Sequence, residues 1–207
     1  MTVSDVFQTL SPTTLADALN REQVMDIGIR PLWQPMPRMA GPAYTVRCAP
    51  ADNLMLHVAI YRAPPGSVIV VEAGDVDYAV SGGNVCAVAK RRGIAGFVID
   101  GVIRDLAEVR EDRFPVFARG VIPIPGGKQG PGELNNTIRC GGVQVSAGDV
   151  VVADEEGVVV VPAARQDAVL EAARKRAAKD ASLSLDEWEA AHRARIDVIL
   201  RDTGFVE

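Results

Sequence analysis

The sequence predicts a layered α/β fold in a single domain. Apolar runs typical of buried strands alternate with helical segments in the middle of the chain, which indicates strand–helix–strand units. Short apolar runs separated by turns follow at 143–162 and indicate an antiparallel ribbon, so a simple doubly wound sheet is not expected. The 207 residues, 48% of them apolar, suffice for one domain with a full core, and we expect that domain to span 1–207.

Each element in the first half rests on a local pattern. Ser11, Thr13 or Thr14 can cap an N-terminal helix, and the apolar run at 67–73 lies between Gly66 and Gly74, as expected for a strand covered on both faces. In chain order we expect a helix at 4–25, a Pro/Gly-rich connector at 26–42, a strand at 43–49, a helix at 53–63 and a strand at 67–73.

The second half continues the alternation and ends in a helix. Gly82-Gly83 opens an Ala/Val-rich helix that ends in cations and Gly93, which suit a helix C-terminus. The segment 122–142 is too long to be a simple connection. In order we expect a helix to residue 93, a strand at 94–101, a short helix at 103–111, a strand at 114–120, a loop at 122–142, two or three strands at 143–162, and a helix from about 165 to 202.

Composition excludes several classes of function. The 27 acidic residues outnumber the 22 basic ones, giving a net charge of −5, so nucleic acid is not an expected partner. No apolar stretch reaches the ~20 residues of a membrane span, and the N-terminus lacks the pattern of a signal peptide. The three cysteines show no zinc spacing. We therefore expect a cytoplasmic protein without a membrane partner.

Common catalytic motifs are missing from the sequence. Gly127-Lys128 lacks both the preceding Gly and the following Ser or Thr of a phosphate loop. The two histidines predict no catalytic base: His57 lies in an apolar helix and suggests a structural role, and His192 lies in a charged helix. None of the four lysines follows an apolar strand, where a Schiff-base lysine would be expected, so a metal is favoured over an imine.

One constellation does suggest chemistry. Gly82-Gly83 and the residues Asn84, Val85 and Cys86 form a Gly-rich entry to a helix, whose free N–H groups suit an anion. Arg104, Asp105 and Glu108 follow a buried strand, and two carboxylates three residues apart can hold a hard divalent cation. The residue types alone favour a solvated turn, in which Arg104 pairs with a surface acid and Asp105 or Glu108 caps the helix.

Several segments resemble the RraA-like family, which includes metal-dependent 4-hydroxy-4-methyl-2-oxoglutarate aldolases and regulators of ribonuclease E activity. They are RPLWQPMPRMAGPAYTVRCAPADNL, GIAGFVIDGVIRDLAEV, FPVFARG and GDVVVADEEGVVVVP, and the similarity covers roughly 10–180. The lyase signature is Gly, twenty residues, Arg-Asp, two residues, then Glu or Asp. Gly83, Arg104, Asp105 and Glu108 match it in full. The resemblance implies a β/β/α swivelling-type fold assembled as trimers or pairs of trimers.

The resemblance further implies a divalent-metal-dependent C–C lyase acting on small 2-oxo acids. It would be a class II pyruvate aldolase or an oxaloacetate decarboxylase. Mg²⁺ or Mn²⁺ at Asp105 and Glu108 would stabilise an enolate with Arg104, a metal-bound water would act as base, and the Gly83–Cys86 segment would bind the substrate carboxylate. Asp180 of a neighbouring subunit is a candidate for an acid that contacts the metal ligands without binding the metal itself. A ribonuclease E regulator without chemistry and a solute-binding or structural trimer remain alternatives.

Overall fold

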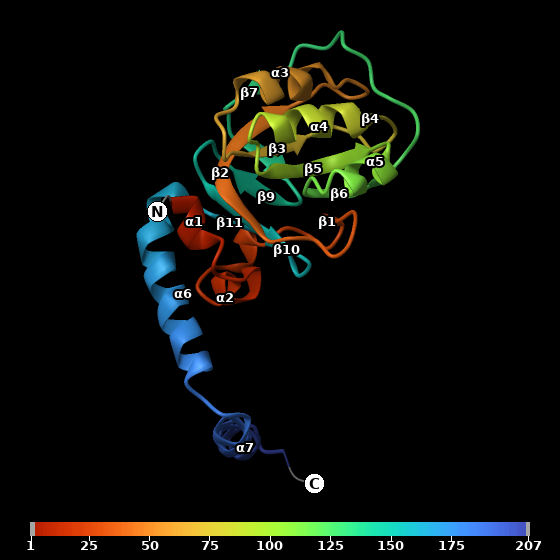
Figure 1. Ribbon diagram of the computed structural model, residues 1–207. Coiled ribbons are helices and arrows are strands. Elements are labelled where there is room, and N and C mark those ends of the chain that lie inside the picture. Colours follow the sequence, from red (N-terminus) through yellow and green to blue (C-terminus); the bar gives the residue numbers. More distant parts are fainter. Residues whose placement is uncertain (1–2, 206–207) are drawn as a thin grey trace.

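A mixed β-sheet organises the chain (Figure 1). The computed structural model describes residues 3–205, and within that range nine strands join one sheet in the order β1-β6-β5-β3-β2-β10-β11, with β4 beside β5 and β7 beside β2. Strands β8 and β9 form a separate hairpin. The predicted layered α/β architecture is confirmed.

The strands and helices have the following bounds. The strands are β1 (Arg30–Pro31), β2 (Met39–Arg47), β3 (Val68–Glu72), β4 (Ala79–Ser81), β5 (Gly96–Ile103), β6 (Val116–Val121), β7 (Glu133–Leu134), β8 (Ile138–Cys140), β9 (Val143–Val145), β10 (Val150–Asp154) and β11 (Gly157–Val161). The helices are α1 (Val3–Phe7), α2 (Pro12–Ala16), α3 (Leu54–Arg62), α4 (Gly83–Arg91), α5 (Leu106–Glu111), α6 (Gln166–Ala181) and α7 (Leu185–Asp202), with 3-10 turns at Arg21–Gln23 and Ala163–Arg165.

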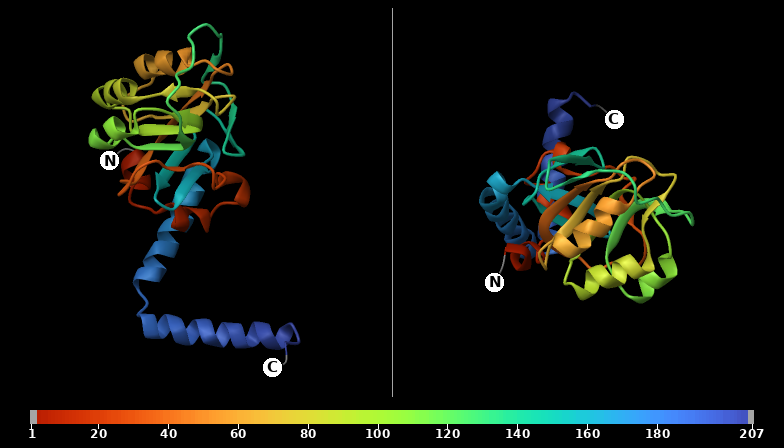
Figure 2. Two further views of the ribbon diagram at one scale, coloured as in Figure 1. Left: turned by 90° about the vertical axis from the view of Figure 1, so that its right-hand side faces the viewer. Right: turned by 90° about the horizontal axis from the view of Figure 1, so that it is seen from above.

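The centre of the sheet is parallel and covered on both faces. Strands β2, β3, β5 and β6 run parallel, and the pairing of β5 with β6 shifts register between Ile99 and Val102. Helices α3, α4 and α5 lie on one face and the β8–β9 hairpin on the other (Figures 1 and 2). Residues Val68 to Val71 are fully buried, which explains their unbroken apolar run. The parallel arrangement brings the C-terminal ends of β3, β4 and β5 to one edge.

A second core lies at the other end of β2. Residues 39–42 of β2 pair antiparallel with β10, whereas 43–47 pair with β3, so one strand joins both parts of the fold. The β10–β11 hairpin, α1, α2 and α6 enclose this core, in which Phe7, Leu15, Val161 and Ala173 are fully buried. The first half of helix α6 is therefore packed against the sheet through this second core.

The single N-terminal helix expected at 4–25 is wrong. Ser11 begins α2 by accepting a hydrogen bond from the N–H of Thr14 at 3.1 Å, and Pro12 occupies the first helical position. Helix α2 ends at Ala16, and after a turn the backbone N–H of Met25 pairs with the carbonyl of Val158 on β11. Pairing with the sheet replaces the helical hydrogen bonds that the sequence pattern suggested.

The C-terminal helix expected at 165–202 is interrupted at 182–184. Ser184 starts α7 through a reciprocal cap, because its hydroxyl accepts from the N–H of Glu187 at 3.2 Å and its own N–H donates to the Glu187 carboxylate at 2.8 Å. Helices α6 and α7 extend away from the body in two directions (Figure 2). Within 3–205, no helix combines the length and apolarity needed to cross a bilayer.

Candidate active site

The residues of the predicted constellation meet at the edge where β4 and β5 end. β4 leads into Gly82 and α4, while β5 leads into Arg104 and α5. The two strands are parallel, and the N–H of Arg104 donates to the carbonyl of Ser81 at 3.0 Å. The twenty residues between Gly83 and Arg104 are α4 running away from this edge and β5 returning to it.

Both glycines make room for carboxylates. A Cβ atom on Gly82 would lie 2.5 Å from Asp105 Oδ2, and one on Gly83 would lie 1.9 Å from Glu108 Oε2. The N–H of Gly83 donates to Asp105 Oδ2 at 3.2 Å, and Arg104 Nε lies 3.4 Å from the same oxygen. The two acids thus converge on a two-residue segment without side chains, beside an arginine and at the start of a helix.

The backbone of Asp105 is left-handed, with φ 57° and ψ 40°. Aspartate tolerates this conformation better than most residues, although it still costs free energy relative to a right-handed one. The conformation turns the chain directly from β5 into α5, so that Asp105 and Glu108 both lie beside α4. Both residues are exposed, and the Arg104 side chain is about two-fifths exposed, which leaves the carboxylates accessible to a ligand.

A cavity of about 90 Å³ opens beside this constellation. Arg104, Asp105, Gly82, Asn84 and Val85 line one side. Asn53, which directly precedes α3, lines it as well, together with His57 of α3 and Lys128 of the 122–142 loop. The cavity therefore combines two cations, one carboxylate and one imidazole in a volume that suits a small anion.

Lys128, His57 and Asn53 were not predicted as site residues. They come from segments distant in sequence from Arg104, and only tertiary packing brings them together. The unusual length of the 122–142 segment was the one available signal. This segment is not merely a loop, because it contains β7 and β8 and returns over the cavity at Pro125 and Lys128.

Asp52 holds the Lys128 segment in place. This buried carboxylate accepts hydrogen bonds from the N–H groups of Gln129 at 2.5 Å and Gly130 at 2.9 Å, and from that of Leu54, at the start of α3, at 2.8 Å. Burial opposes ionisation of Asp52, but these N–H donors and the Lys128 ammonium outweigh it and lower its pKa. One ionised side chain thereby ties two walls of the cavity together.

Asp52→Asn should destabilise the protein in a pH-dependent way. Because the pKa of Asp52 is lower in the folded chain, its contribution is present above the unfolded value and is lost as pH falls through the folded value. We expect a loss of about 1.5–3 kcal/mol at pH 7, the range for hydrogen bonds to a charged group, and a smaller loss near pH 3. Urea unfolding at both pH values measures it, and an equal loss at both would contradict this role.

Cys86 does not fit its predicted role. Its N–H donates to the carbonyl of Gly82 at 3.0 Å within the first turn of α4, and is therefore not free for a substrate. Its thiol is fully buried, lies 3.5 Å from the Ser81 hydroxyl, and has its pKa raised by burial to about 12. Asn84 and Val85 line the cavity in the first helical turn, where N–H groups have no intrahelical acceptor.

Asp180 lies away from the cavity of its own chain. Its carboxylate pairs with Arg176 Nε at 2.9 Å on α6. Helix α6 lies on the side of the molecule away from α3 and α4 (Figure 1). The prediction placed it at the site of a neighbouring subunit, and it stays a prediction.

The donor set suits a cation that keeps water ligands. Among residues 3–205, no group of three or more His, Cys, Asp or Glu side chains is arranged to hold a metal ion. Asp105 and Glu108 supply carboxylate oxygens, and Mg²⁺ commonly binds through one or two carboxylates while water and substrate complete its coordination. The space that Gly82 and Gly83 leave for both carboxylates fits this mode of binding.

Gly83→Ala should inactivate the site without unfolding the protein. The new Cβ would displace the Glu108 carboxylate, which is the end of a flexible side chain. Because a small displacement near a reaction centre can cost about 10²-fold in rate, we expect a loss of that order with a nearly unchanged melting temperature. Gly120→Ala is a matched control, since its Cβ would meet only Val102 at 4.0 Å. Full activity in Gly83→Ala would show that the Glu108 position is unimportant.

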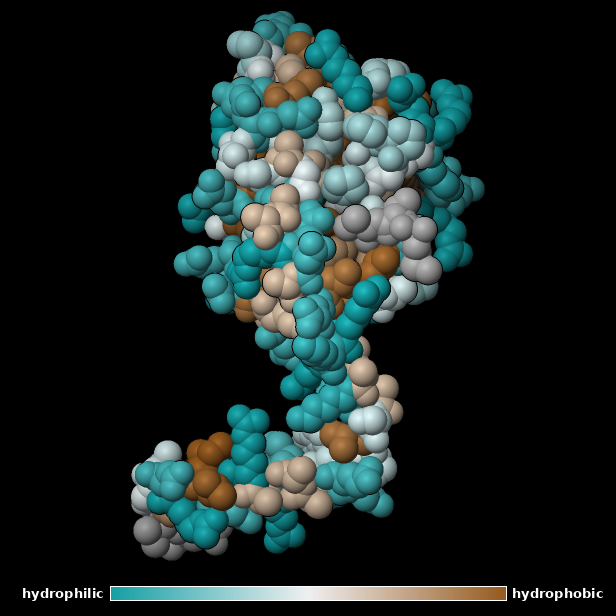
Figure 3. Space-filling model, turned by 90° about the vertical axis from the view of Figure 1, so that its left-hand side faces the viewer, coloured by the Kyte–Doolittle hydropathy of each residue, from teal (hydrophilic) through white to brown (hydrophobic). Residues whose placement is uncertain are grey.

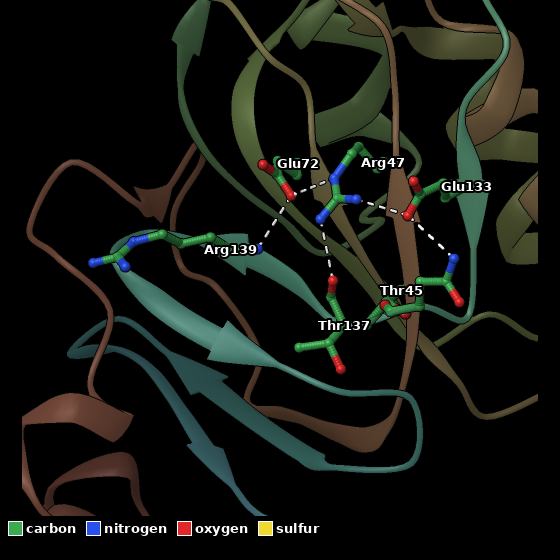
Figure 4. Close-up of polar contacts among 7 residues, drawn as sticks. Thr45, Arg47, Glu72, Glu133, Thr137 and Arg139 are labelled. Atoms are coloured by element: carbon green, nitrogen blue, oxygen red, sulfur yellow. Dashed lines mark hydrogen bonds and ion pairs between the residues drawn. The ribbon is translucent and has the colours of Figure 1, made fainter.

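A second polar cluster on the sheet is structural. Arg47 contacts Glu72 Oε2 at 3.0 Å, Glu133 Oε2 at 2.7 Å and the carbonyl of Thr137 at 3.1 Å (Figure 4). Glu72 also accepts the N–H of Arg139. The cluster links β2, β3, β7 and β8, and none of its members lines the cavity beside Arg104. It attaches the far end of the 122–142 segment to the sheet.

Comparisons with known proteins identify the family. The profile of the RraA-like family, described as Aldolase/RraA, matches residues 12–160. A Halalkalibacterium halodurans protein provisionally named 4-hydroxy-4-methyl-2-oxoglutarate aldolase is 39% identical over 202 residues, covering 97% of this chain and 92% of that protein.

Two solved structures share the fold. An uncharacterised protein from Pseudomonas syringae has a TM-score of 0.77 and 29% identity, covering 91% of this chain and 93% of the other. The RNA-processing inhibitor RraA from Thermus thermophilus has a TM-score of 0.66 and 29% identity, covering 72% of this chain and 91% of its own. The family profile spans the whole constellation from Gly83 to Glu108, and the chain belongs to the RraA-like family.

Proposed function

We propose that this protein is a divalent-metal-dependent lyase that cleaves a C–C bond in small 2-oxo acids. The convergence of Arg104, Asp105 and Glu108 on Gly82-Gly83, beside a cavity of about 90 Å³, carries the proposal. The name of the Halalkalibacterium relative supports 4-hydroxy-4-methyl-2-oxoglutarate as a substrate. Oxaloacetate is a second substrate on chemical grounds, because its decarboxylation needs only an electron sink next to the breaking bond.

The protein groups of the cavity match the charges of such a substrate. The first-turn N–H groups of Asn84 and Val85 bind the carboxylate next to the 2-oxo group. Arg104 donates to the 2-oxo oxygen, where negative charge grows as the C–C bond breaks. The Lys128 ammonium, which also lines the cavity, neutralises a second carboxylate of the substrate.

Asp105 and Glu108 would hold the divalent cation. When bound, it would supply Lewis-acid stabilisation of the charge on the 2-oxo oxygen. Asp105 also holds the start of α4 through the N–H of Gly83 and stays close to Arg104. The orientations of the acid and the arginine are therefore coupled.

A pyruvate-release assay tests the proposal directly. The purified protein is given 4-hydroxy-4-methyl-2-oxoglutarate or oxaloacetate with Mg²⁺ or Mn²⁺, and then excess EDTA. We expect pyruvate from both substrates and loss of release with EDTA that added metal restores. If neither metal supports pyruvate release from either substrate, the lyase proposal is contradicted. Pyruvate release that persists in excess EDTA would show that the activity does not depend on a divalent metal.

Regulation of RNA processing is the alternative function. It is supported by 29% identity to the Thermus RNA-processing inhibitor over 72% of this chain. A regulator would bind the regulatory region of a ribonuclease without using the cavity. Binding in a pull-down that Asp105→Asn leaves intact, together with no pyruvate release, would favour this alternative.

We also propose a closed cyclic homo-oligomer, most simply a trimer or a pair of trimers. Helix α7 contacts little of the body, and apolar residues are exposed along it (Figure 3). Leu185, Trp188, Ile196 and Ile199 recur at helical spacing, with Leu185 76% and Trp188 48% exposed. An exposed apolar stripe of this kind is typical of a protein interface.

Light scattering tests the assembly. We expect the mass of a trimer or hexamer for the wild type and a shift towards monomer for Ile199→Asp. Ala194→Asp, which introduces the same charge on the opposite side of α7, is the control and should assemble normally. A wild-type monomer at micromolar concentration would contradict the proposal.

A further inference from the structure

His57 offers the cavity a basic group that the sequence alone did not suggest. It lies on α3 one turn after Asn53, and its own N–H donates to the Asn53 carbonyl at 3.2 Å. Its half-buried imidazole lines the same cavity as Arg104 and Lys128. The metal-ligand candidates Asp105 and Glu108 are on a different element, so His57 is a separate feature of the cavity.

Asn53 carries a buried side-chain oxygen that has no hydrogen-bond donor in the described part of the chain. Its side chain is only 4% exposed, and its Nδ2 donates to the carbonyl of Gly126 at 3.1 Å, which fixes the orientation of the amide. Its Oδ1 is buried and has no hydrogen-bond partner within residues 3–205. A buried acceptor without a donor is costly, so a ligand hydroxyl is the natural complement to it.

The charges around His57 favour the neutral imidazole. Burial lowers its pKa and the Lys128 ammonium lowers it further, whereas Asp52 acts in the opposite direction. Arg104 and Asp105 are the other charged groups that line the cavity. Near neutral pH the imidazole is therefore a proton acceptor, while the carboxamide of Asn53 can accept a hydrogen bond but not the proton itself.

We propose that His57 is the general base that removes the 4-hydroxyl proton of a 4-hydroxy-2-oxo acid, with Asn53 positioning that hydroxyl. This inference rests on the proposed lyase function and replaces the metal-bound water expected from the sequence as the base. Carboxylate-binding groups of the cavity hold the substrate, and the two acceptors at Asn53 and His57 meet the hydroxyl at C4.

The proton and electron pairs balance in this step. The imidazole nitrogen takes the hydroxyl proton, the O–H pair becomes the new C4=O bond, and the C3–C4 bond breaks. The released pair forms the C2=C3 bond of the enolate, whose oxygen carries the charge beside Arg104. The imidazolium then returns the proton to C3, which yields pyruvate, the second carbonyl product and neutral His57.

Decarboxylation of oxaloacetate provides a built-in comparison. That substrate has no hydroxyl proton to remove, and the proton that C3 gains comes from solvent. General-base catalysis typically contributes roughly 10²–10⁴-fold. We therefore expect His57→Gln to lower kcat for 4-hydroxy-4-methyl-2-oxoglutarate by that factor and to lower oxaloacetate decarboxylation at least tenfold less.

The experiment measures both reactions in wild type, His57→Gln and His192→Gln. His192 is the other histidine of the chain and is the matched control. Because it stacks on Trp188 of α7, light scattering is used to check that His192→Gln assembles as the wild type does. Wild-type kcat/KM for cleavage should fall at acid pH with a midpoint below the usual histidine pKa of ~6.5. In His57→Gln, kcat/KM for cleavage should no longer fall at acid pH. His192→Gln should behave as the wild type does in both reactions.

The remaining outcomes separate the base from the lyase function. Normal cleavage by His57→Gln, or equal loss of both reactions, overturns His57 as the base while the lyase function stands. Wild type that releases pyruvate from neither substrate overturns both proposals. A melting curve for each variant shows whether equal loss reflects unfolding, and Asn53→Ala then supplies the second readout. We expect Asn53→Ala to raise KM for the hydroxy substrate, while its kcat/KM still falls at acid pH as in the wild type. An unchanged KM would overturn the role of Asn53.

Discussion

Asp105→Asn should reduce metal-dependent pyruvate release by about 10³-fold or more. The amide removes the negative charge that a divalent cation requires, and the loss of several kcal/mol of transition-state stabilisation corresponds to a factor of that size. Asparagine tolerates the left-handed backbone at this position, so the fold should persist.

Two measurements check the Asp105 prediction. Steady-state pyruvate release gives the rate, and calorimetric titration with Mn²⁺ gives the metal affinity independently of turnover. Glu111→Gln, at the far end of α5, is the control and should change neither. Wild-type turnover and Mn²⁺ affinity in Asp105→Asn would show that the metal binds elsewhere.

Arg104→Ala should lower kcat by about 10²–10³-fold, similar to the loss of one oxyanion donor. An arginine that bound only the ground-state carboxylate would instead affect KM and leave kcat nearly unchanged. Arg104→Lys should restore activity only in part, because an ammonium cannot reproduce the planar fork of the guanidinium.

Oxalate inhibition distinguishes the two roles of Arg104. Oxalate resembles the planar enolate of pyruvate, so it should compete with substrate in the wild type and bind more weakly to Arg104→Ala. Arg110→Ala, which removes an exposed arginine of α5, should be inhibited as strongly as wild type. Unchanged inhibition in Arg104→Ala would place the enolate away from this side chain.

The sequence predicts those parts of the fold and site that depend on local patterns. The buried run at Val68–Val71 predicts β3 because a strand covered on both faces must be apolar throughout. Gly83, Arg104 and Asp105 could be selected because their spacing matches the signature of the family that the sequence resembles. Their convergence follows from one helix and one strand, both of which the sequence indicates.

Features created by long-range packing could not be predicted. His57 appeared structural because its helix is apolar, and Lys128 was not selected because it does not follow an apolar strand. The structure places them in one cavity because Asp52 joins their segments. The N-terminal helix was overextended because pairing of Met25 with β11 is invisible in the local sequence.

The separation of the cavity walls along the chain has an evolutionary consequence. Residues 81–108 carry the arginine and both acids, whereas Asn53, His57 and Lys128 lie on segments outside that stretch. Substitutions in α3 or at 125–130 can therefore change the substrate that is selected while the groups that stabilise the enolate stay intact. Relatives that share Gly83, Arg104, Asp105 and Glu108 but differ in α3 and this loop are accordingly expected to have diverged in substrate while conserving the reaction.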